Sequence, residues 1–254
     1  MIIAITNQKG GVGKTTTALN LSAGLALLGH STLLIDTDPQ GHSSISSVTN
    51  PSEYPLSLYD ALMKKGHHIE ELIINSTIPG LDVIISKISM AKLEPSLIGE
   101  LDAHYRLKDI LESIRPKYDY IMIDTPPTLG LITLNSLAAA DFILIPIQSS
   151  YLCLEGTDDL LETIEKVKKI ANPNLKVIGV LVTLFTKRTN IAKDVVHRIR
   201  KVFGSLVFKT MISKSVKLEE SPAYKESIFT YAPNSVGAFQ YRKVAEELIK
   251  RAKN

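Results

Sequence analysis

The sequence predicts an α/β protein in which a mostly parallel, twisted sheet carries helices on both faces. Short β-branched runs alternate with longer helical patterns along the 254 residues, which is the order that βαβ units produce. The strand-like runs are almost wholly apolar, as expected for strands that are buried on both faces. A glycine-rich loop joins the first expected strand to the first expected helix. These observations favour a single domain, residues 1–254.

The expected elements follow one another in regular order. Strands are expected where β-branched and aliphatic residues cluster, at residues 2–6, 32–36, 82–86, 120–124, 142–147, 176–183 and 206–211. Helices are expected near residues 14–28, 57–65, 105–114, 131–140, 152–170, 191–203 and 236–252. Gly29 is a stop signal for the first helix.

Residues 40–55 form the least regular stretch and are rich in Ser, Thr, Asn and Pro. Such a stretch can be an interdomain linker or a loop within a domain. Because the strand and helix pattern resumes on both sides without a shift in composition, we favour an active-site loop over a domain boundary.

Composition excludes several classes of protein. Twenty-nine basic and 26 acidic side chains give a net charge of only +3, so any basic surface must be local. Cys153 is the only cysteine, which excludes a disulfide framework, a thiolate zinc site and an iron–sulfur cluster within one chain. Met1 is followed by aliphatic residues without a basic region, so no signal peptide is expected. A cytoplasmic location is expected.

The strongest signal is the loop of residues 9–16, which reads Lys-Gly-Gly-Val-Gly-Lys-Thr-Thr between a strand and a helix. Glycines let backbone amides approach an anion, and the helix N-terminus adds its positive dipole end. Lys14 is placed to meet the β- and γ-phosphates, and the Thr15 hydroxyl to coordinate Mg²⁺. Gln8 stands where the common pattern has glycine, and Lys9 opens the loop instead. The alternative, a glycine-rich turn with two solvated lysines, does not explain this placement.

Carboxylates follow two of the expected strands. Asp36 and Asp38 leave the second strand, and Asp124 leaves the fourth. Ligands of open α/β sheets collect outside the carboxyl ends of the strands, so these groups are expected to face the same crevice as the loop. There they can hold Mg²⁺ or orient the attacking water. A lone aspartate at such a position is more often a helix cap or turn former, but three in this order favour the chemical role.

Residues 7–17 closely resemble the deviant Walker A motif of the ParA/Soj partition ATPases, relatives of MinD. The resemblance implies the P-loop NTPase fold and runs from end to end, as in the short form that lacks an N-terminal DNA-binding domain. It implies that Lys9 reaches across a nucleotide sandwich dimer to the partner's phosphates. It also implies that Asp38 orients water for hydrolysis and that Asp124 is the Walker B aspartate.

The expected site therefore has three sets of residues. The catalytic residues are Lys9, Lys14 and Asp38, and the metal ligands are Thr15, Asp38 and Asp124. The nucleotide contacts are Lys9, Gly10, Gly11, Val12, Gly13, Lys14, Thr15, Thr16, Asp124, Ser213 and Ser215. The last two are expected from the resemblance, because the family often reads Ile-Pro-Arg-Asn on the adenine side where this chain has Ile-Ser-Lys-Ser at residues 212–215.

Residues 187–217 contain nine basic side chains and one acidic side chain. This local charge makes a candidate contact zone for a phosphate backbone. Arg188 and Lys217 match positions that the family uses for sequence-independent DNA binding, and Lys214 lies between them. The alternative is a solvated helix face at residues 193–201. No recognition-helix signature is found, so base-specific reading is not expected.

The resemblance implies a switch that dimerises with ATP and Mg²⁺, binds DNA non-specifically on the nucleoid, and hydrolyses ATP to drive plasmid or chromosome partition with a ParB-like partner. One alternative is a MinD-like positioning ATPase at the membrane, but the chain ends polar over residues 250–254, so no membrane partner is expected. A second is a metabolic ATP-dependent ligase or synthetase, for which we find no small-molecule motif. Relatives that assemble or carry iron–sulfur clusters need paired cysteines, and the single Cys153 excludes this class.

Overall fold

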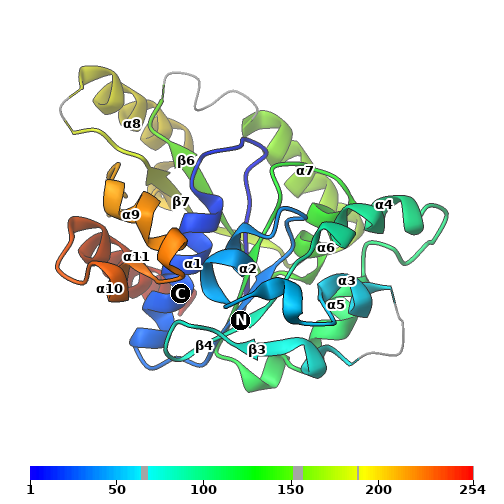
Figure 1. Ribbon diagram of the computed structural model, residues 1–254. Helices are drawn as coiled ribbons and strands as arrows, with labels where there is room; N and C mark the ends of the chain where they lie inside the picture. The colour runs from blue at the N-terminus through cyan, green and yellow to red at the C-terminus, as the bar shows by residue number, and fades with distance from the viewer. Residues whose placement is uncertain (64–67, 151–156, 188, 254) are drawn as a thin grey trace.

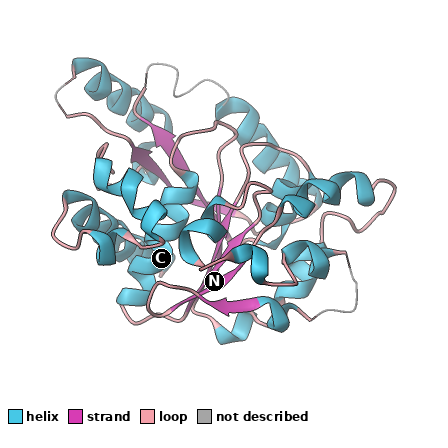
Figure 2. Ribbon diagram, in the orientation of Figure 1, coloured by secondary structure: helices cyan, strands magenta, loops and turns pink. Residues whose placement is uncertain are grey.

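The computed structural model describes residues 1–63, 68–150, 157–187 and 189–253. Its sheet has the strand order β3-β4-β2-β5-β1-β6-β7, and β3 alone runs antiparallel to its neighbour (Figure 2). The strands are β1 (Ile2–Ile5), β2 (Thr32–Asp36), β3 (Ile73–Asn75), β4 (Leu81–Ile84), β5 (Tyr120–Asp124), β6 (Phe142–Gln148) and β7 (Lys176–Thr183). The predicted mostly parallel sheet is confirmed.

Helices cover both faces of this sheet (Figure 1). They are α1 (Lys14–Leu27), α2 (His42–Ser47), α3 (Leu58–Leu62), α4 (Leu93–Ser96), α5 (Arg106–Leu111), α6 (Leu131–Ala139), α7 (Thr157–Ile170), α8 (Asn190–Phe203), α9 (Val216–Glu220), α10 (Ile228–Tyr231) and α11 (Val236–Ala252). The side chains of α1 and α11 pack on one face, and those of α5 to α8 pack on the other. Strand β1 shows why the strands are apolar throughout, because Ile2 and Ala4 enter one core and Ile3 and Ile5 the other.

Five of the described helices and strands were not predicted, namely β3, α2, α4, α9 and α10. Strand β3 is short and half-exposed at the edge of the sheet, so it lacks the apolar run that marks the other strands. Helix α2 lies within the stretch predicted as an irregular loop, and four of its six residues are serine. The predicted helices near residues 57–65 and 152–170 are found as α3 and α7, although residues 64–67 and 151–156 lie outside the described residues.

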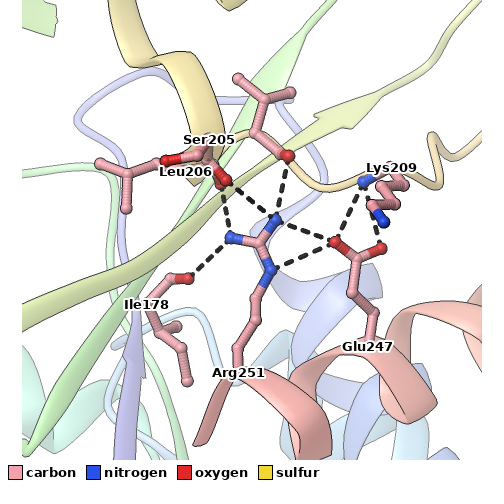
Figure 3. A network of polar contacts seen from close by, with 7 residues as sticks. Ile178, Ser205, Leu206, Lys209, Glu247 and Arg251 are labelled. Atoms are coloured by element: carbon pink, nitrogen blue, oxygen red, sulfur yellow. Dashed lines mark hydrogen bonds and ion pairs between the residues drawn. The ribbon is translucent and has the colours of Figure 1, made fainter. Parts of the chain in front are cut away.

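The strand predicted at residues 206–211 is wrong. This segment follows the edge of β7 but forms only isolated bridges, and Phe208 and Ile212 donate to the carbonyls of Val180 and Val182. Between these two hydrogen bonds the segment advances by four residues while β7 advances by two, so the two chains cannot pair as a regular β-ladder. The segment's polar groups bond to side chains of α11 instead, because Arg251 donates to the carbonyls of Leu206, Val207 and the preceding Ser205, and Glu247 accepts from the Lys209 N–H (Figure 3).

The Arg251 side chain ties this segment to β7 and to α11. It also donates to the carbonyl of Ile178 at 3.1 Å and to Glu247 at 2.9 Å (Figure 3). Its guanidinium carbon lies over the Phe208 ring, 4.3 Å from the ring centroid. Arg251→Met would remove the Arg251 donor from these carbonyls and would leave the Glu247 carboxylate with the Lys209 N–H but without its charged partner. We expect the free energy of unfolding in urea to fall by about 2–3 kcal/mol.

The matched control is Arg242→Met on the same helix, where the arginine is exposed and lies 3.9 Å from Glu246. This variant should change the unfolding free energy by less than about 0.5 kcal/mol. Equal destabilisation by the two substitutions would show that Arg251 has no special role in holding the segment.

Candidate nucleotide and magnesium site

The loop between β1 and α1 has the backbone of an anion cradle. Gly11 and Gly13 have φ values of +72° and +83°, a region that residues with a Cβ rarely adopt. The loop is held from both sides, since Thr183 Oγ1 donates to the Val12 carbonyl at 2.8 Å and the Lys9 N–H donates to Asn7 Oδ1 at 3.0 Å. Asn7 in turn donates to the Pro146 carbonyl in β6. The chain therefore presents a preformed loop at the N-terminus of α1.

Lys14 lies inside this loop and is only 7% exposed. Its Nζ donates to the Lys9 carbonyl at 2.8 Å. Burial lowers the pKa of Lys14, and the nearby Asp124 and Asp38 carboxylates oppose that shift. The ammonium group is therefore poorly hydrated and close to both acidic groups, which is the setting in which an added anionic phosphate is most stabilising.

Asp36 and Asp124 are direct partners on neighbouring strands β2 and β5, and both are buried. Burial raises the pKa of each carboxyl group; the charge of Asp124 adds to the rise at Asp36. Asp124 Oδ2 accepts from Ser43 Oγ at 2.6 Å, and the Ser43 and Thr15 hydroxyls oppose the shift at Asp124. Among the described residues, Asp124 Oδ1 has no hydrogen-bond partner.

These groups fit a magnesium ion. Mg²⁺ prefers hard oxygen ligands, and a buried carboxylate oxygen without a donor, beside a threonine hydroxyl, is such a ligand set. A divalent cation would also supply the positive charge that stabilises two neighbouring buried carboxylates in their ionised form. The arrangement therefore suits Thr15 and Asp124 to hold Mg²⁺ next to the phosphates of a nucleotide.

Asp38 is buried and lines this site. Its Oδ1 accepts from the Gln40 N–H at 2.9 Å, and its own N–H donates to Asp36 Oδ1 at 3.0 Å. Most of the predicted phosphate and metal residues share one pocket of about 480 Å³ with it, namely Gly10, Gly11, Gly13, Lys14, Thr15 and Thr16. The Val12 side chain is buried, so its contribution is limited to its backbone. Asp124 lies below the surface.

The sequence analysis missed the serines of α2. Ser44 donates to Asp36 Oδ2 through its N–H at 2.8 Å and through its hydroxyl at 2.7 Å. Together with Ser43 on Asp124, it attaches the start of α2 to both buried carboxylates. The signal was present as a Ser-rich run directly after the acidic motif, but serine clusters are also typical of loops.

Ser213 and Ser215 line a second pocket of about 260 Å³, which continues from the first because both are lined by Gly13, Thr16, Leu184 and Glu219. Its walls are largely apolar and include Ile212, Leu218 and Tyr241. Such walls suit the faces of a purine base, and the serines supply polar groups. The two serines that were predicted to lie on the adenine side are therefore found beside the phosphate loop, although about 200 residues separate them from it along the chain.

The predicted DNA-contact lysines lie outside these pockets. Lys214 and Lys217 are exposed, and Arg188 lies outside the described residues. The Lys214 N–H donates to the Phe185 carbonyl, so the segments around residues 185–187 and 212–214 are neighbours. Lys217 Nζ lies 2.9 Å from Glu220 and 5.4 Å from the Tyr231 ring centroid. Helix α8 exposes further basic residues, as a solvated helix face would.

Comparison with known proteins bears on this site. A family model described as an AAA domain matches residues 1–177. The chain is 42% identical to the sporulation initiation inhibitor protein Soj of Bacillus subtilis over 97% of both chains, and 42% identical to the chromosome partitioning protein ParA of Myxococcus xanthus over 98% of this chain and 88% of that one. Cobyrinic acid a,c-diamide synthase of Mycobacterium smegmatis, solved with ADP and magnesium, superposes with a TM-score of 0.88 at 31% identity and covers 100% of this chain and 95% of that one.

Proposed function

The chain belongs to the Soj/ParA family of partition ATPases, and from this premise we propose that its ATP-bound dimer is a switch that binds DNA without sequence preference. The chain is an ATPase whose cofactors are ATP and Mg²⁺. One observation carries the proposal: Lys14, Thr15 and Asp38 line one pocket at the carboxyl ends of the strands, with Asp124 buried beside Lys14.

Each residue has a distinct role in the proposed reaction. The loop amides and Lys14 bind the β- and γ-phosphates, while Thr15 and Asp124 hold the metal. Bound Mg²⁺ neutralises charge on the phosphate oxygens. Asp38 orients the attacking water, because it lines the pocket with one carboxylate oxygen already held by the Gln40 N–H. Asp36 holds the Asp38 backbone N–H, and Ser44 in turn donates to Asp36, so these two residues fix the position of Asp38.

Lys9 acts across the dimer. One nucleotide site gives no physical reason for two lysines in the loop, but a site shared by two subunits does, since the second ammonium group offsets charge that develops on the transferring phosphoryl group. The homodimer would unite two basic surfaces, each with the exposed Lys214 and Lys217. Doubling the contacts makes DNA affinity depend steeply on ATP.

The biological role follows from this switch. A ParB-like protein bound to the cargo would stimulate hydrolysis and release the dimer from DNA. The chain would then be associated with the nucleoid, and its cargo would be a plasmid or a chromosome. This proposal rests on the relatives' names for the process and on the chain's own basic segment for the DNA contact.

Two other functions fit the fold less well. A MinD-like membrane anchor needs a free apolar face at the C-terminus, but Val244 and Leu248 in the second half of α11 are buried in the core. In the described part of the chain, no helix has the length and apolar character needed to cross a membrane. A ligase would resemble the Mycobacterium smegmatis synthase, whose identity of 31% is lower than that of the partition proteins.

DNA binding tests the proposed switch directly. We expect the chain with ATP and Mg²⁺ to bind a duplex of arbitrary sequence at least about tenfold more tightly than with ADP or without nucleotide, because two linked patches bind together. Affinity measured by fluorescence anisotropy should fall steeply as salt rises, since phosphate contacts release counterions. Equal affinity in the three nucleotide states would contradict the switch.

Charge reversal at the lysines supplies the matched comparison. Lys214→Glu with Lys217→Glu should remove most of the ATP-dependent DNA binding and leave ATP binding measurable. Lys117→Glu is the control, because this exposed lysine precedes β5 at the opposite end of the strand from the nucleotide pocket. If the control weakens DNA binding as much as the pair does, the contact surface lies elsewhere.

A further inference from the structure

The second pocket, which Ser213 and Ser215 line and which we call the base pocket, borders a hydrogen-bonded pair whose partners come from distant parts of the chain. Ser213 lines the pocket, and Gln240 lies on α11 directly before Tyr241, which also lines it. The Ser213 N–H donates to Gln240 Oε1 at 2.9 Å, and Gln240 Nε2 donates to Ser213 Oγ at 2.8 Å. Ser213 and Gln240 are both partly buried, so this pair is partly shielded from solvent.

The direction of both hydrogen bonds is set by the peptide group. A backbone N–H can only donate, so the amide oxygen of Gln240 has to face it. The NH₂ group of the same amide then faces Ser213 Oγ, which has to accept. A serine hydroxyl carries a single proton, and here that proton remains available to donate to a different acceptor.

The backbone donors around Ser213 are also engaged. The Ile212 N–H donates to the Val182 carbonyl at 2.9 Å, and the Lys214 N–H donates to the Phe185 carbonyl at 3.2 Å. With the Ser213 N–H held by Gln240, residues 212–214 have no backbone N–H left for a base. The Ser213 hydroxyl is therefore the donor that this segment offers to the pocket.

We propose that Gln240 is a positioning residue that makes this pocket select adenine over guanine, an inference that rests on the proposed ATP site. The Watson–Crick edge of adenine has an acceptor at N1, where guanine has a donor. The Ser213 proton that Gln240 leaves free can donate to N1 of adenine, whereas guanine offers no acceptor at N1. Proline, which the family often has in place of Ser213, lacks the N–H and could not form this pair.

The substitution Gln240→Glu tests the proposal by reversing the hydroxyl. A carboxylate accepts from both the Ser213 N–H and the Ser213 hydroxyl, so the proton turns away from the pocket and Oγ presents only lone pairs. Equilibrium constants for ATP and GTP are measured with Mg²⁺ on the full chain, by displacement of ribose-labelled fluorescent ATP. We expect the preference for ATP over GTP to fall about three- to tenfold.

A double-mutant cycle separates this role from simple packing. Ser213→Ala should reduce the preference by a similar factor, and Gln240→Glu should then add nothing in the Ser213→Ala background. Additive losses, or an unchanged preference in Gln240→Glu, would overturn the proposal. If the glutamate variant does not fold, Gln240→Leu provides the same comparison with a smaller expected loss, because the hydroxyl becomes free to rotate.

Arg242→Gln is the control, since this exposed residue lies on the same helix and should leave the preference unchanged. Failure of the unmodified chain to bind either nucleotide would instead overturn the proposed ATP function. The two failures are therefore distinguishable in one set of titrations.

Discussion

The Asp38→Asn variant is expected to bind ATP with nearly unchanged affinity and to lose about 10²- to 10⁴-fold in hydrolysis rate. Asparagine keeps an oxygen that can accept the Gln40 N–H, and its backbone N–H still reaches Asp36, so the loop geometry survives the change. Only the charge that orients the attacking water is removed. The ATP-bound dimer should therefore accumulate.

Single-turnover hydrolysis and light scattering of the same samples check this result. Asp109→Asn is the control, because Asp109 is an exposed aspartate on α5, outside the nucleotide pockets. A variant at Asp38 that hydrolyses ATP at the unmodified rate would show that another group orients the water. Loss of ATP binding itself would show that Asp38 contributes mainly to nucleotide affinity.

The Lys9→Ala variant should keep measurable ATP binding as a monomer, lose ATP-dependent dimers, and hydrolyse ATP at least about 10³-fold more slowly. Two bonds that shape the loop at this position come from the Lys9 backbone, whose N–H donates to Asn7 and whose carbonyl accepts from Lys14. Alanine keeps both groups. The substitution therefore tests the side chain alone.

Lys14→Ala provides the comparison, since it should weaken ATP binding within one subunit and so abolish every later step. Nucleotide titration separates the two variants before any dimer is measured. If Lys9→Ala dimerises normally with ATP in light scattering, the shared-site mechanism is wrong and the second lysine of the loop acts within its own subunit.

Several elements of the fold and the site were predictable because their causes are local. The strands bury both faces, so their apolar runs stand out, and six of the seven predicted strands are found. Gly11 and Gly13 mark positive φ values that few other residues tolerate. Asp38 and Asp124 follow neighbouring strands of a parallel sheet, whose carboxyl ends meet at one edge.

Other features depend on partners that no sequence window contains. Residues 206–211 have the composition of a strand, but Arg251 and Glu247 take up their polar groups from 40 residues away along the chain. Helix α2 has the composition of a loop, and its first turn is bonded to the Asp36 and Asp124 carboxylates through Ser43 and Ser44. In both cases long-range hydrogen bonds override local propensity.

Residue order along the chain thus accounts for the sheet, the phosphate loop and the set of acidic residues. The spacing of apolar residues, the positions of the glycines and the aspartates at strand ends can all be read from short segments. Packing alone decides which oxygens of Asp124 are bonded, how α2 supports the two carboxylates, and how Gln240 orients Ser213. Hydrogen bonds are short and directional, so their partners become known only when the folded chain brings distant residues within about 3 Å of one another.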